Sequence, residues 1–449
     1  MATLERRLGP LDAAAIIVSN VIGGGILFTP PQIAAAVPAA IPFLLTWVAG
    51  GLLAFAGAMS YAELAAVRPK AGGEYVYLRD ALGRLAAFLS GWTSFVAGFA
   101  GAIATSAVVV SFYLGRFIPA AGDATPLFSL PVIPGVITVS MSRQSIVALV
   151  AIWGLAWVHR RGVGHGRLVG NVLATLKVAA LVVFVALGLS VGTSGTAHLV
   201  EQHPVAITGW LLALIPVMFT YSGWNAASYV AEEIRDPGRN VPRAFALGTT
   251  AVVVLYVLLN ILYLFVFPIG ELGSVKGSVL DVVAERLLGG TAGDVMGVVS
   301  IVSLLASVSA MTFAGPRVYF AMARDGLFFR AASAIHPRYH TPSNAILAQS
   351  VWTSILVLTA TADALVTYTG FAITLFLGLA VVSLFVLRAR EPDVPRPFRA
   401  WLYPFAPALY VVISAAILIN GLVRDPRPTG SGALIILAGV PLFYFFKRK

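Results

Sequence analysis

Long apolar runs recur along the whole of this 449-residue sequence, and they constrain its fold more than any other feature. Each run holds about 18 or more mostly apolar residues, enough for a helix to cross a hydrocarbon core roughly 30 Å thick. Hydrophobic residues make up 59% of the chain and charged residues only 11%, too few to give a soluble protein of this size a polar surface. Because the runs repeat, one very apolar soluble core is excluded. The sequence predicts an all-α, multi-pass integral membrane protein.

We expect 12 transmembrane helices, with both ends of the chain on the same side of the membrane. The predicted spans cover residues 12–37, 42–67, 85–115, 144–158, 168–190, 209–231, 244–267, 294–322, 345–361, 364–387, 403–420 and 432–446. The segments between them are too short for an independent soluble domain, and residues 116–142 are expected to form an irregular cap. Function must therefore lie within the membrane.

The positions of the 30 Lys and Arg residues predict the orientation. Most lie in one alternating set of loops and at the termini. The opposite loops hold only Arg116, Arg143, Lys276, Arg286, Arg424 and Arg427. By the positive-inside rule, the cation-rich loops and both termini are cytoplasmic, in a cell (inner or plasma) membrane. The net charge of +11 thus reflects topology, and no nucleic-acid partner is expected because the cations form no single basic domain.

Several functional classes are excluded by what the spans do not contain. The chain has no cysteine, so disulfides, thiolate metal sites and thiolate nucleophiles are excluded. All six histidines fall in loops, without acidic partners in a span at metal-ligand spacing. We therefore predict no catalytic residue, no metal and no cofactor. A channel would need a polar lining across several spans, which this sequence lacks.

The first predicted span is interrupted near its middle. Gly23, Gly24 and Gly25 are consecutive, and each is a poorer helix former than alanine by roughly 1 kcal/mol. Pro30 and Pro31 follow one turn later. Packing motifs place small residues four apart, so close helix packing explains this run less well. We expect the chain to unwind here, where bare backbone is tolerated because it lines a cavity.

The sixth predicted span contains a second interruption. Pro216 lies one to two turns ahead of a Ser-Gly-Trp-Asn run that starts at Ser222. Taken alone, this pattern fits a proline kink, but two breaks at the first positions of two five-helix units indicate an inverted repeat. We predict a first repeat over residues 1–190, a second over 209–387, and two further spans over 403–446.

The ends of the two broken helices predict the chemistry of the ligand. Amide groups from Gly23 to Ile26 lie at the positive end of a half-helix, a site for a carboxylate. Carbonyl groups freed near Ile22, and from Phe219 to Ser222, accept hydrogen bonds from an ammonium group. A molecule with both groups on one carbon satisfies both ends. We therefore predict an α-amino acid as the substrate.

Four stretches of the sequence carry a family resemblance. They are Gly23–Ile26, Tyr61–Tyr75, Phe219–Arg243 and Arg317–Gly326, in this order along spans one to ten. Together they resemble the amino acid, polyamine and organocation permease superfamily, and within it the L-type amino acid transporter-like group. One departure is Gly24, where the family usually has serine, so one hydroxyl donor is missing.

This resemblance implies a five-plus-five inverted-repeat fold and secondary-active transport by alternating access. It places the carboxylate of the substrate on the three glycines, the amino group on carbonyls of Ile22, Phe219 and Ser222, and the side chain against Asn225. Phe219 would also form a lid, with Trp224 as a second candidate for the gate. The substrate site predicted in full comprises Ile22, Gly23, Gly24, Gly25, Ile26, Phe219, Ser222, Gly223 and Asn225.

Lys177 is the only full charge in the middle of the fifth predicted span. It lies about 14 Å along the helix, so its stem does not easily reach either surface, and a central lysine costs about 3 kcal/mol. Carbonyls freed at Gly23 and the hydroxyls of Ser303 or Ser307 are its expected partners, as a structural staple or a coupling site. In related permeases such a lysine stands where sodium-coupled relatives bind the cation, which implies sodium-independent transport.

The acidic residues bear on the choice of substrate. Glu63, Glu74, Glu232 and Glu233 lie near predicted cytoplasmic ends among arginines, and we interpret them as inner-gate or structural ion pairs. Without an acidic residue in mid-span or a free cation near Asn225, neutral L-amino acids are favoured. A polyamine or other organic-cation permease is the alternative, and exchange and proton symport both stay open. Membrane lipid is the other expected partner, and a disulfide-linked partner subunit is excluded.

Overall fold

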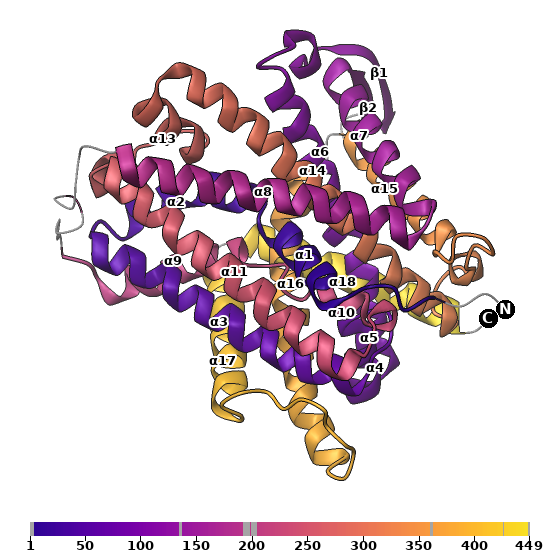
Figure 1. The fold of residues 1–449 in the computed structure, drawn as a ribbon. Helices are drawn as coiled ribbons and strands as arrows, with labels where there is room; N and C mark the ends of the chain where they lie inside the picture. Colours follow the sequence, from indigo (N-terminus) through magenta and orange to yellow (C-terminus); the bar gives the residue numbers. More distant parts are fainter. Residues whose placement is uncertain are drawn as a thin grey trace.

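The computed structural model describes residues 4–133, 137–191, 198, 204–359, 362–424 and 426–447, and helices make up most of it (Figure 1). Its elements are α1 (Pro10–Val21), α2 (Gly24–Ala36), α3 (Ala40–Val67), α4 (Glu74–Leu82), α5 (Arg84–Thr93), α6 (Phe99–Leu114), β1 (Pro126–Ile133), β2 (Ile137–Ser142), α7 (Arg143–Arg160), α8 (Val163–Val191), α9 (Ile207–Thr220), α10 (Ala226–Tyr229), α11 (Pro237–Val266), α12 (Ile269–Leu272), α13 (Val279–Leu288), α14 (Gly290–Arg324), α15 (Ser343–Leu358), α16 (Ala362–Arg390), α17 (Phe405–Arg424) and α18 (Pro426–Lys447).

Within these described ranges, 8 helices are long and apolar enough to cross a membrane. They are Ala40–Val67, Arg84–Leu114, Val163–Val191, Pro237–Val266, Gly290–Arg324, Gly370–Arg390, Phe405–Val423 and Thr429–Lys447. The bent pair of α1 and α2 makes a ninth candidate, and α15 and most of α9 are shorter apolar helices. A helical, multi-pass membrane protein is therefore confirmed, while length and composition alone account for fewer crossings than the 12 that we predicted.

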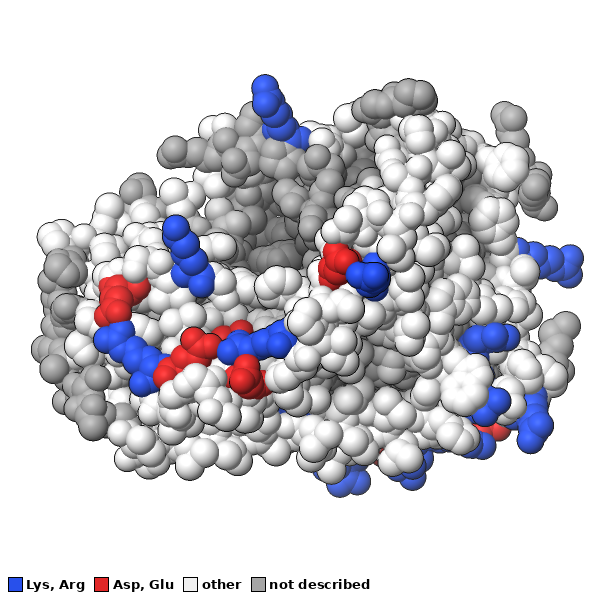
Figure 2. Space-filling view, turned by 90° about the horizontal axis from the view of Figure 1, so that it is seen from above, with Lys and Arg blue, Asp and Glu red and all other residues white. Residues whose placement is uncertain are grey.

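The surface agrees with a membrane environment. Figure 2 shows a face on which uncharged side chains predominate among the described residues. Lysine and arginine side chains gather toward its right-hand edge, the side on which both termini lie in Figure 1. Elsewhere on this face, several red and blue side chains touch one another. An apolar outer surface with few unpaired charges suits contact with lipid.

One segment differs from the all-α prediction. Where an irregular cap was expected, β1 and β2 form an antiparallel hairpin, with Ser129 opposite Ser140 and Leu130 opposite Val139. Isoleucine, valine and threonine recur in these two segments, and such β-branched residues favour strands. The fold is otherwise helical in the part of the chain that the structure describes.

Both predicted helix breaks are present. α1 ends at Val21 and α2 begins at Gly24 with a bend of 50°, so the interruption is shorter than the glycine and proline pattern suggested. Pro30 and Pro31 lie inside α2 instead of extending the break. In the second case α9 ends at Thr220, and the chain turns before the short helix α10.

A buried ion pair holds the segment after α10 against α14. Arg317 donates from Nε to Glu233 Oε1 at 2.8 Å and from Nη2 to Oε2 at 3.1 Å, and both side chains are fully buried. Loss of one partner from such a pair leaves a buried charge uncompensated, at a cost of about 3–5 kcal/mol. The pair therefore holds the segment after the second break on α14, and α1 also packs against α14 and against α11.

Candidate substrate site

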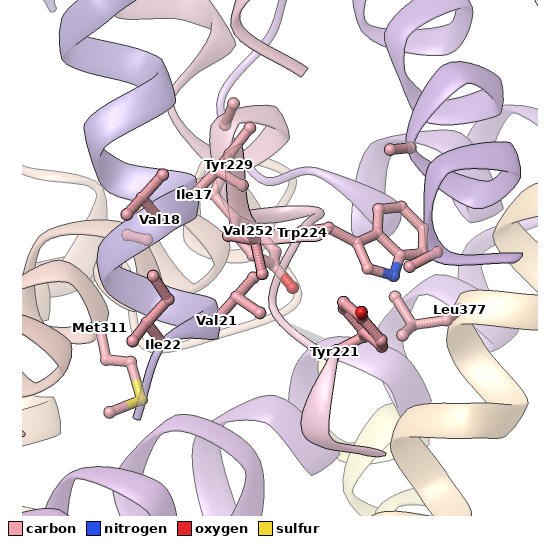
Figure 3. Close-up of a cluster of buried hydrophobic side chains, with 14 of the residues drawn as sticks. Ile17, Val18, Val21, Ile22, Tyr221, Trp224, Tyr229, Val252, Met311 and Leu377 are labelled. Carbon is pink, nitrogen blue, oxygen red and sulfur yellow. The ribbon is translucent and has the colours of Figure 1, made fainter. Parts of the chain in front are cut away.

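The two broken helices meet in the interior of the bundle. Figure 3 shows the last turn of α1 beside the segment that joins α9 to α10. Asn20 Nδ2 donates to the carbonyl of Gly223 at 3.3 Å, which links the two segments directly. Gly223 has a φ of +104°, and a Cβ there would lie 3.1 Å from the backbone of Asn20. Glycine is therefore required for this close approach.

A second contact joins the same two regions from the other half of each helix. Thr220 Oγ1 at the end of α9 donates to Thr29 Oγ1 of α2 at 3.0 Å. Tyr256 of α11 donates to the carbonyl of Val21 at 3.0 Å, near the end of α1. The sequence-based prediction that both breaks contribute to one place in the fold agrees with these contacts.

A cavity of about 170 Å³ lies beside this junction. Asn20, Phe219, Ser222, Gly223 and Asn225 line it from the two breaks. Ser94 and Gly98 line it from the π-helical turn that connects α5 and α6. Single π turns within α-helices occur frequently at functional sites. Most of the predicted residues of the second break are thus brought together in one cavity.

Phe219 lies between this cavity and a wider one. The second cavity, of about 420 Å³, is lined by residues of α9, α16, α17 and α18, and it shares Phe219, Ser222, Ile373 and Leu377 with the first. The Phe219 side chain is 46% exposed although it lies on an apolar helix. A large aromatic ring at a shared wall can separate two compartments, as the lid role requires.

Replacement of Phe219 by alanine is expected to reduce transport and leave membrane insertion intact, because an apolar helix stays apolar. Loss of an aromatic contact with the substrate costs about 1.5–3 kcal/mol, which corresponds to a loss of affinity of about ten- to 100-fold. Uptake into proteoliposomes and thermal unfolding protected by substrate measure the two effects separately. Unchanged affinity together with unchanged turnover would show that Phe219 is not a lid.

Trp224 is placed differently. Its ring is buried, with Tyr61 at 4.9 Å and Tyr410 at 5.8 Å in edge-to-face contact. A Cβ on Gly57 of α3 would lie 2.6 Å from the indole, so the glycine at this position leaves the space that the ring occupies. In Figure 3 the indole lies beside Tyr221 and Leu377. These contacts make Trp224 a packing residue of the break, although it also lines the wider cavity.

The glycines of the first break begin α2 and are partly exposed, but they do not line the smaller cavity. Gly23 precedes the helix, and Gly24 and Gly25 are its first residues. The first four amides of a helix have no partner within the helix, so a carboxylate binding position is available there. Ile26, in the same predicted group, is buried and offers only its backbone.

The carbonyls at the end of α1 already have partners. Lys177 of α8 is fully buried, and its Nζ donates to the carbonyl of Ser19 at 3.2 Å and to that of Ile22. Ser307 Oγ donates to the same two carbonyls at 2.8 and 3.1 Å, and Ser303 Oγ lies 3.5 Å from that of Ile22. The negative end of α1 is thus neutralised by α8 and α14.

These contacts correct two details of the sequence-based prediction. The partners of Lys177 are carbonyls of Ser19 and Ile22, one to four positions before Gly23, because α1 ends earlier than expected. The carbonyl of Ile22, predicted to receive an ammonium group, is shared by three other donors. That of Phe219 accepts the amide of Ser222 at 2.9 Å. Neither carbonyl is free in this conformation.

Three of the four acidic residues form the expected ion pairs, although with other arginines than their sequence neighbours. Glu233 pairs with Arg317 and Glu232 with Arg324. Glu63 accepts from Arg388 Nε at 2.9 Å, and a backbone amide also donates to it. Pairing across the fold, which sequence spacing does not reveal, decides these partners.

Glu74 departs from the expectation. It lines the smaller cavity together with Asn225 and Tyr229, and no Lys or Arg of the described chain forms an ion pair with it. Neither Glu74 nor Tyr229 was predicted as part of the substrate site. The only signal in the sequence is the pair Gly72 and Gly73, which indicates a turn just before Glu74. In the structure these glycines have positive φ values of +117° and +56°.

Comparison with known proteins adds the family context. Residues 8–445 match a family model described as amino acid permease. The large neutral amino acids transporter small subunit 2 of Mus musculus is 30% identical over 450 residues, 98% of this chain and 81% of the relative. The Asc-type amino acid transporter 1 of Homo sapiens is 29% identical over 458 residues, 99% and 84% of the two chains. The cystine/glutamate transporter of Pongo abelii is 30% identical over 447 residues, which are 99% of this chain and 85% of the relative.

Proposed function

The chain belongs to the amino acid permease family, and on this basis we propose that it carries neutral L-amino acids across a membrane by alternating access. The observation that supports this most directly is the cavity lined by Asn20 of α1 and by Phe219, Ser222 and Gly223 of the second break. Backbone at membrane depth that borders a cavity offers hydrogen bonds to a small polar ligand.

In this proposal the carboxylate of the substrate binds the free amides at the start of α2, and its side chain extends toward Asn225. Phe219 closes the site from the wider cavity. The ammonium group binds carbonyls of the second break after the helices rearrange, since those of Ile22 and Phe219 have partners in the present conformation. Alternating access supplies such a rearrangement.

We propose the 12-span, five-plus-five architecture for the same reason. Both breaks lie in the first helix of a predicted five-helix unit, and the shorter apolar helices α9 and α15 occupy two of the predicted spans. The excess of cations in alternate loops supports cytoplasmic termini in a cell membrane. A subunit bound through a disulfide is not part of the proposal, because this sequence has no cysteine.

Lys177 supports sodium-independent transport. Its Nζ occupies the space between α1, α8 and α14, next to carbonyl and hydroxyl oxygens of the kind that coordinate a small cation. A fixed ammonium group there performs the electrostatic function of the ion. Whether the cycle is exchange or proton symport depends on a group other than Lys177.

An organic-cation substrate is the second candidate, because Glu74 places a carboxyl group in the cavity. This finding overturns the argument that no acidic residue lies at the site. The family relatives, whose names specify amino acids, favour the first candidate.

Uptake into proteoliposomes tests the proposal. We expect saturable uptake of radiolabelled L-leucine or L-alanine in sodium-free buffer, with little uptake of L-arginine or putrescine. Vesicles with and without internal amino acid distinguish exchange from net uptake. Saturable uptake of putrescine alone would establish the organic-cation function, and an absolute sodium requirement would contradict the role of Lys177.

A further inference from the structure

Glu74 is a carboxyl group in the wall of the cavity, at the first position of α4. α4 is a 9-residue helix and is not one of the candidate spans. The Glu74 side chain is 6% exposed, so water reaches little of it except from the cavity. Its place at the start of α4, facing Asn225 and Tyr229, sets it apart from the three acidic residues that pair with arginine.

Within the part of the chain that the structure describes, only neutral groups donate to this carboxyl group. Tyr229 donates from its hydroxyl to Oε1 at 2.6 Å, and Asn225 Nδ2 lies 3.4 Å from Oε2. Asn225 Nδ2 also donates to the hydroxyl of Tyr229 at 2.7 Å, which completes a small network. Both donors come from the segment that follows the break in the sixth predicted span.

The ionisable groups on the surrounding helices leave its charge uncompensated. Tyr61 of α3, Tyr77 of α4 and Tyr229 face Glu74, and none of them carries a positive charge. The cations of the helices packed against α4 have other partners. Arg388 and Arg390 of α16 bind Glu63 and the Ala81 carbonyl, Arg317 and Arg324 of α14 bind Glu233 and Glu232, and Arg84 of α5 binds the Asp325 carbonyl. On α4 itself, Arg79 pairs with Asp80 and Asp325.

Burial is the largest influence on this group, and it raises the pKa of Glu74 to about 7, against the opposing effect of its hydrogen bonds. The carboxyl group therefore gains and loses a proton near neutral pH.

We propose that Glu74 binds the proton that accompanies the substrate through the transport cycle, so that the proposed amino-acid transport is a proton symport. The carboxylate takes a proton from the more acidic side to form a carboxylic acid, and releases it to the other side. No other reactant is needed, because one O–H bond forms on a carboxyl oxygen when the proton is taken up and the same bond breaks when it is released.

The structure offers a means of coupling proton affinity to conformation. The amide of Gly72 donates to the carbonyl of Tyr229 at 3.1 Å, and a Cβ on Gly73 would lie 2.6 Å from the Tyr229 ring. The start of α4 is therefore pressed against α10, next to the break. If α10 moves when the broken helix rearranges, the two donors move with it. Their loss raises the pKa of the carboxyl group, and their return lowers it.

A proton fits this site better than the cationic end of a substrate. Both carboxyl oxygens already accept hydrogen bonds from the protein, so a bulky cation would have to displace Tyr229 or Asn225. Among the described residues that line the cavity, Glu74 is also the only acidic one, whereas a polyamine carries several charges. Neutralisation by a proton requires neither displacement nor a second acid.

The test compares the parent protein with Glu74→Gln in proteoliposomes, using radiolabelled L-alanine and L-leucine with and without an imposed pH gradient. We expect an acidic exterior to drive accumulation by the parent, with a midpoint near pH 7. In Glu74→Gln the remaining transport no longer depends on pH and is not concentrative. Glu232→Gln is the matched control, because Glu232 does not line the cavity and the amide oxygen of glutamine still accepts from the Ala71 N–H, so this variant is expected to keep the pH dependence.

A second measurement covers the case in which Glu74→Gln does not transport. Calorimetry in two buffers of different ionisation enthalpy reports the proton taken up when L-leucine or L-alanine binds to the solubilised protein. Tyr229→Phe removes a hydrogen-bond donor to the Glu74 carboxylate, so the pH midpoint of proton uptake should be higher in this variant than in the parent. The proposal is overturned if the parent takes up no proton when the amino acid binds, or if Glu74→Gln still couples transport to the pH gradient. It is also overturned if the pH midpoint of Tyr229→Phe equals that of the parent.

The outcomes also separate this inference from the function on which it rests. Failure of both amino acids to enter under any gradient contradicts amino-acid transport itself. Amino-acid uptake that does not depend on pH contradicts only the proton site at Glu74. Inhibition by L-arginine that disappears in Glu74→Gln, without proton coupling in the parent, would instead make Glu74 a binding residue for cationic side chains.

Discussion

Replacement of Lys177 by alanine is expected to abolish or uncouple transport while the protein still inserts and folds. The variant leaves the carbonyls of Ser19 and Ile22 without the ammonium group that now joins them to α8. Ser307 Oγ still donates to both carbonyls, but the variant loses the hydrogen bonds from the charged donor, worth about 1.5–3 kcal/mol each, enough to shift the balance between conformations. The last turn of α1 borders the first break, so this change acts directly on a helix that moves in the proposed transport cycle.

The role of Lys177 can be separated from simple packing. Ser303→Ala removes a weaker donor, 3.5 Å from the same carbonyl, and should reduce transport only slightly. Insertion is checked by size-exclusion chromatography in detergent, and transport by sodium-free uptake of L-leucine and L-alanine. Full activity of Lys177→Ala would refute a coupling role, and rescue of that variant by sodium would show that a cation binds in the space it leaves.

The helical fold and the two breaks could be predicted because their causes are local. Apolar runs of membrane length specify spanning helices in any context, and three successive glycines weaken a helix wherever they occur. The position of the first break was correct within two residues, since α1 ends at Val21. The prolines were a poor guide to the length of the break, because α2 continues through Pro30 and Pro31 although each lacks the N–H group of an intrahelical hydrogen bond.

The environment of Glu74 could not be predicted, because it depends on contacts between distant segments. In the sequence Glu74 stands among arginines, and a salt bridge is the natural expectation. In the fold, neighbouring Arg79 turns to Asp80 and Asp325, while Glu74 faces Tyr229, which lies 155 positions along the chain. The same limit applies to Lys177, whose buried position was predicted but whose partners depend on where α1 ends.

Replacement of Gly24 by valine is expected to eliminate substrate binding without disturbing the fold. A Cβ at this position would meet only the ring of Phe28, at 3.9 Å, which is an ordinary contact. Its φ is not in the left-handed region, so the backbone does not demand glycine. The structure therefore leaves room for a side chain, and the branched methyl groups of valine would occupy the space over the first amides of α2. Two lost hydrogen bonds to a carboxylate, about 1.5–3 kcal/mol each, correspond to at least about 100-fold in affinity.

Gly25 provides the comparison that makes this result interpretable. A Cβ there would lie 3.0 Å from Thr220 Cγ2 and 3.2 Å from its Cα, so Gly25→Ala should lower the thermal unfolding temperature as well as transport. Gly24→Ala should weaken transport less than valine does, because alanine covers fewer amides and favours the helix by up to about 1 kcal/mol. A Gly24→Val protein that unfolds at the parental temperature and transports at the parental rate would show that the carboxylate of the substrate does not bind at the start of α2.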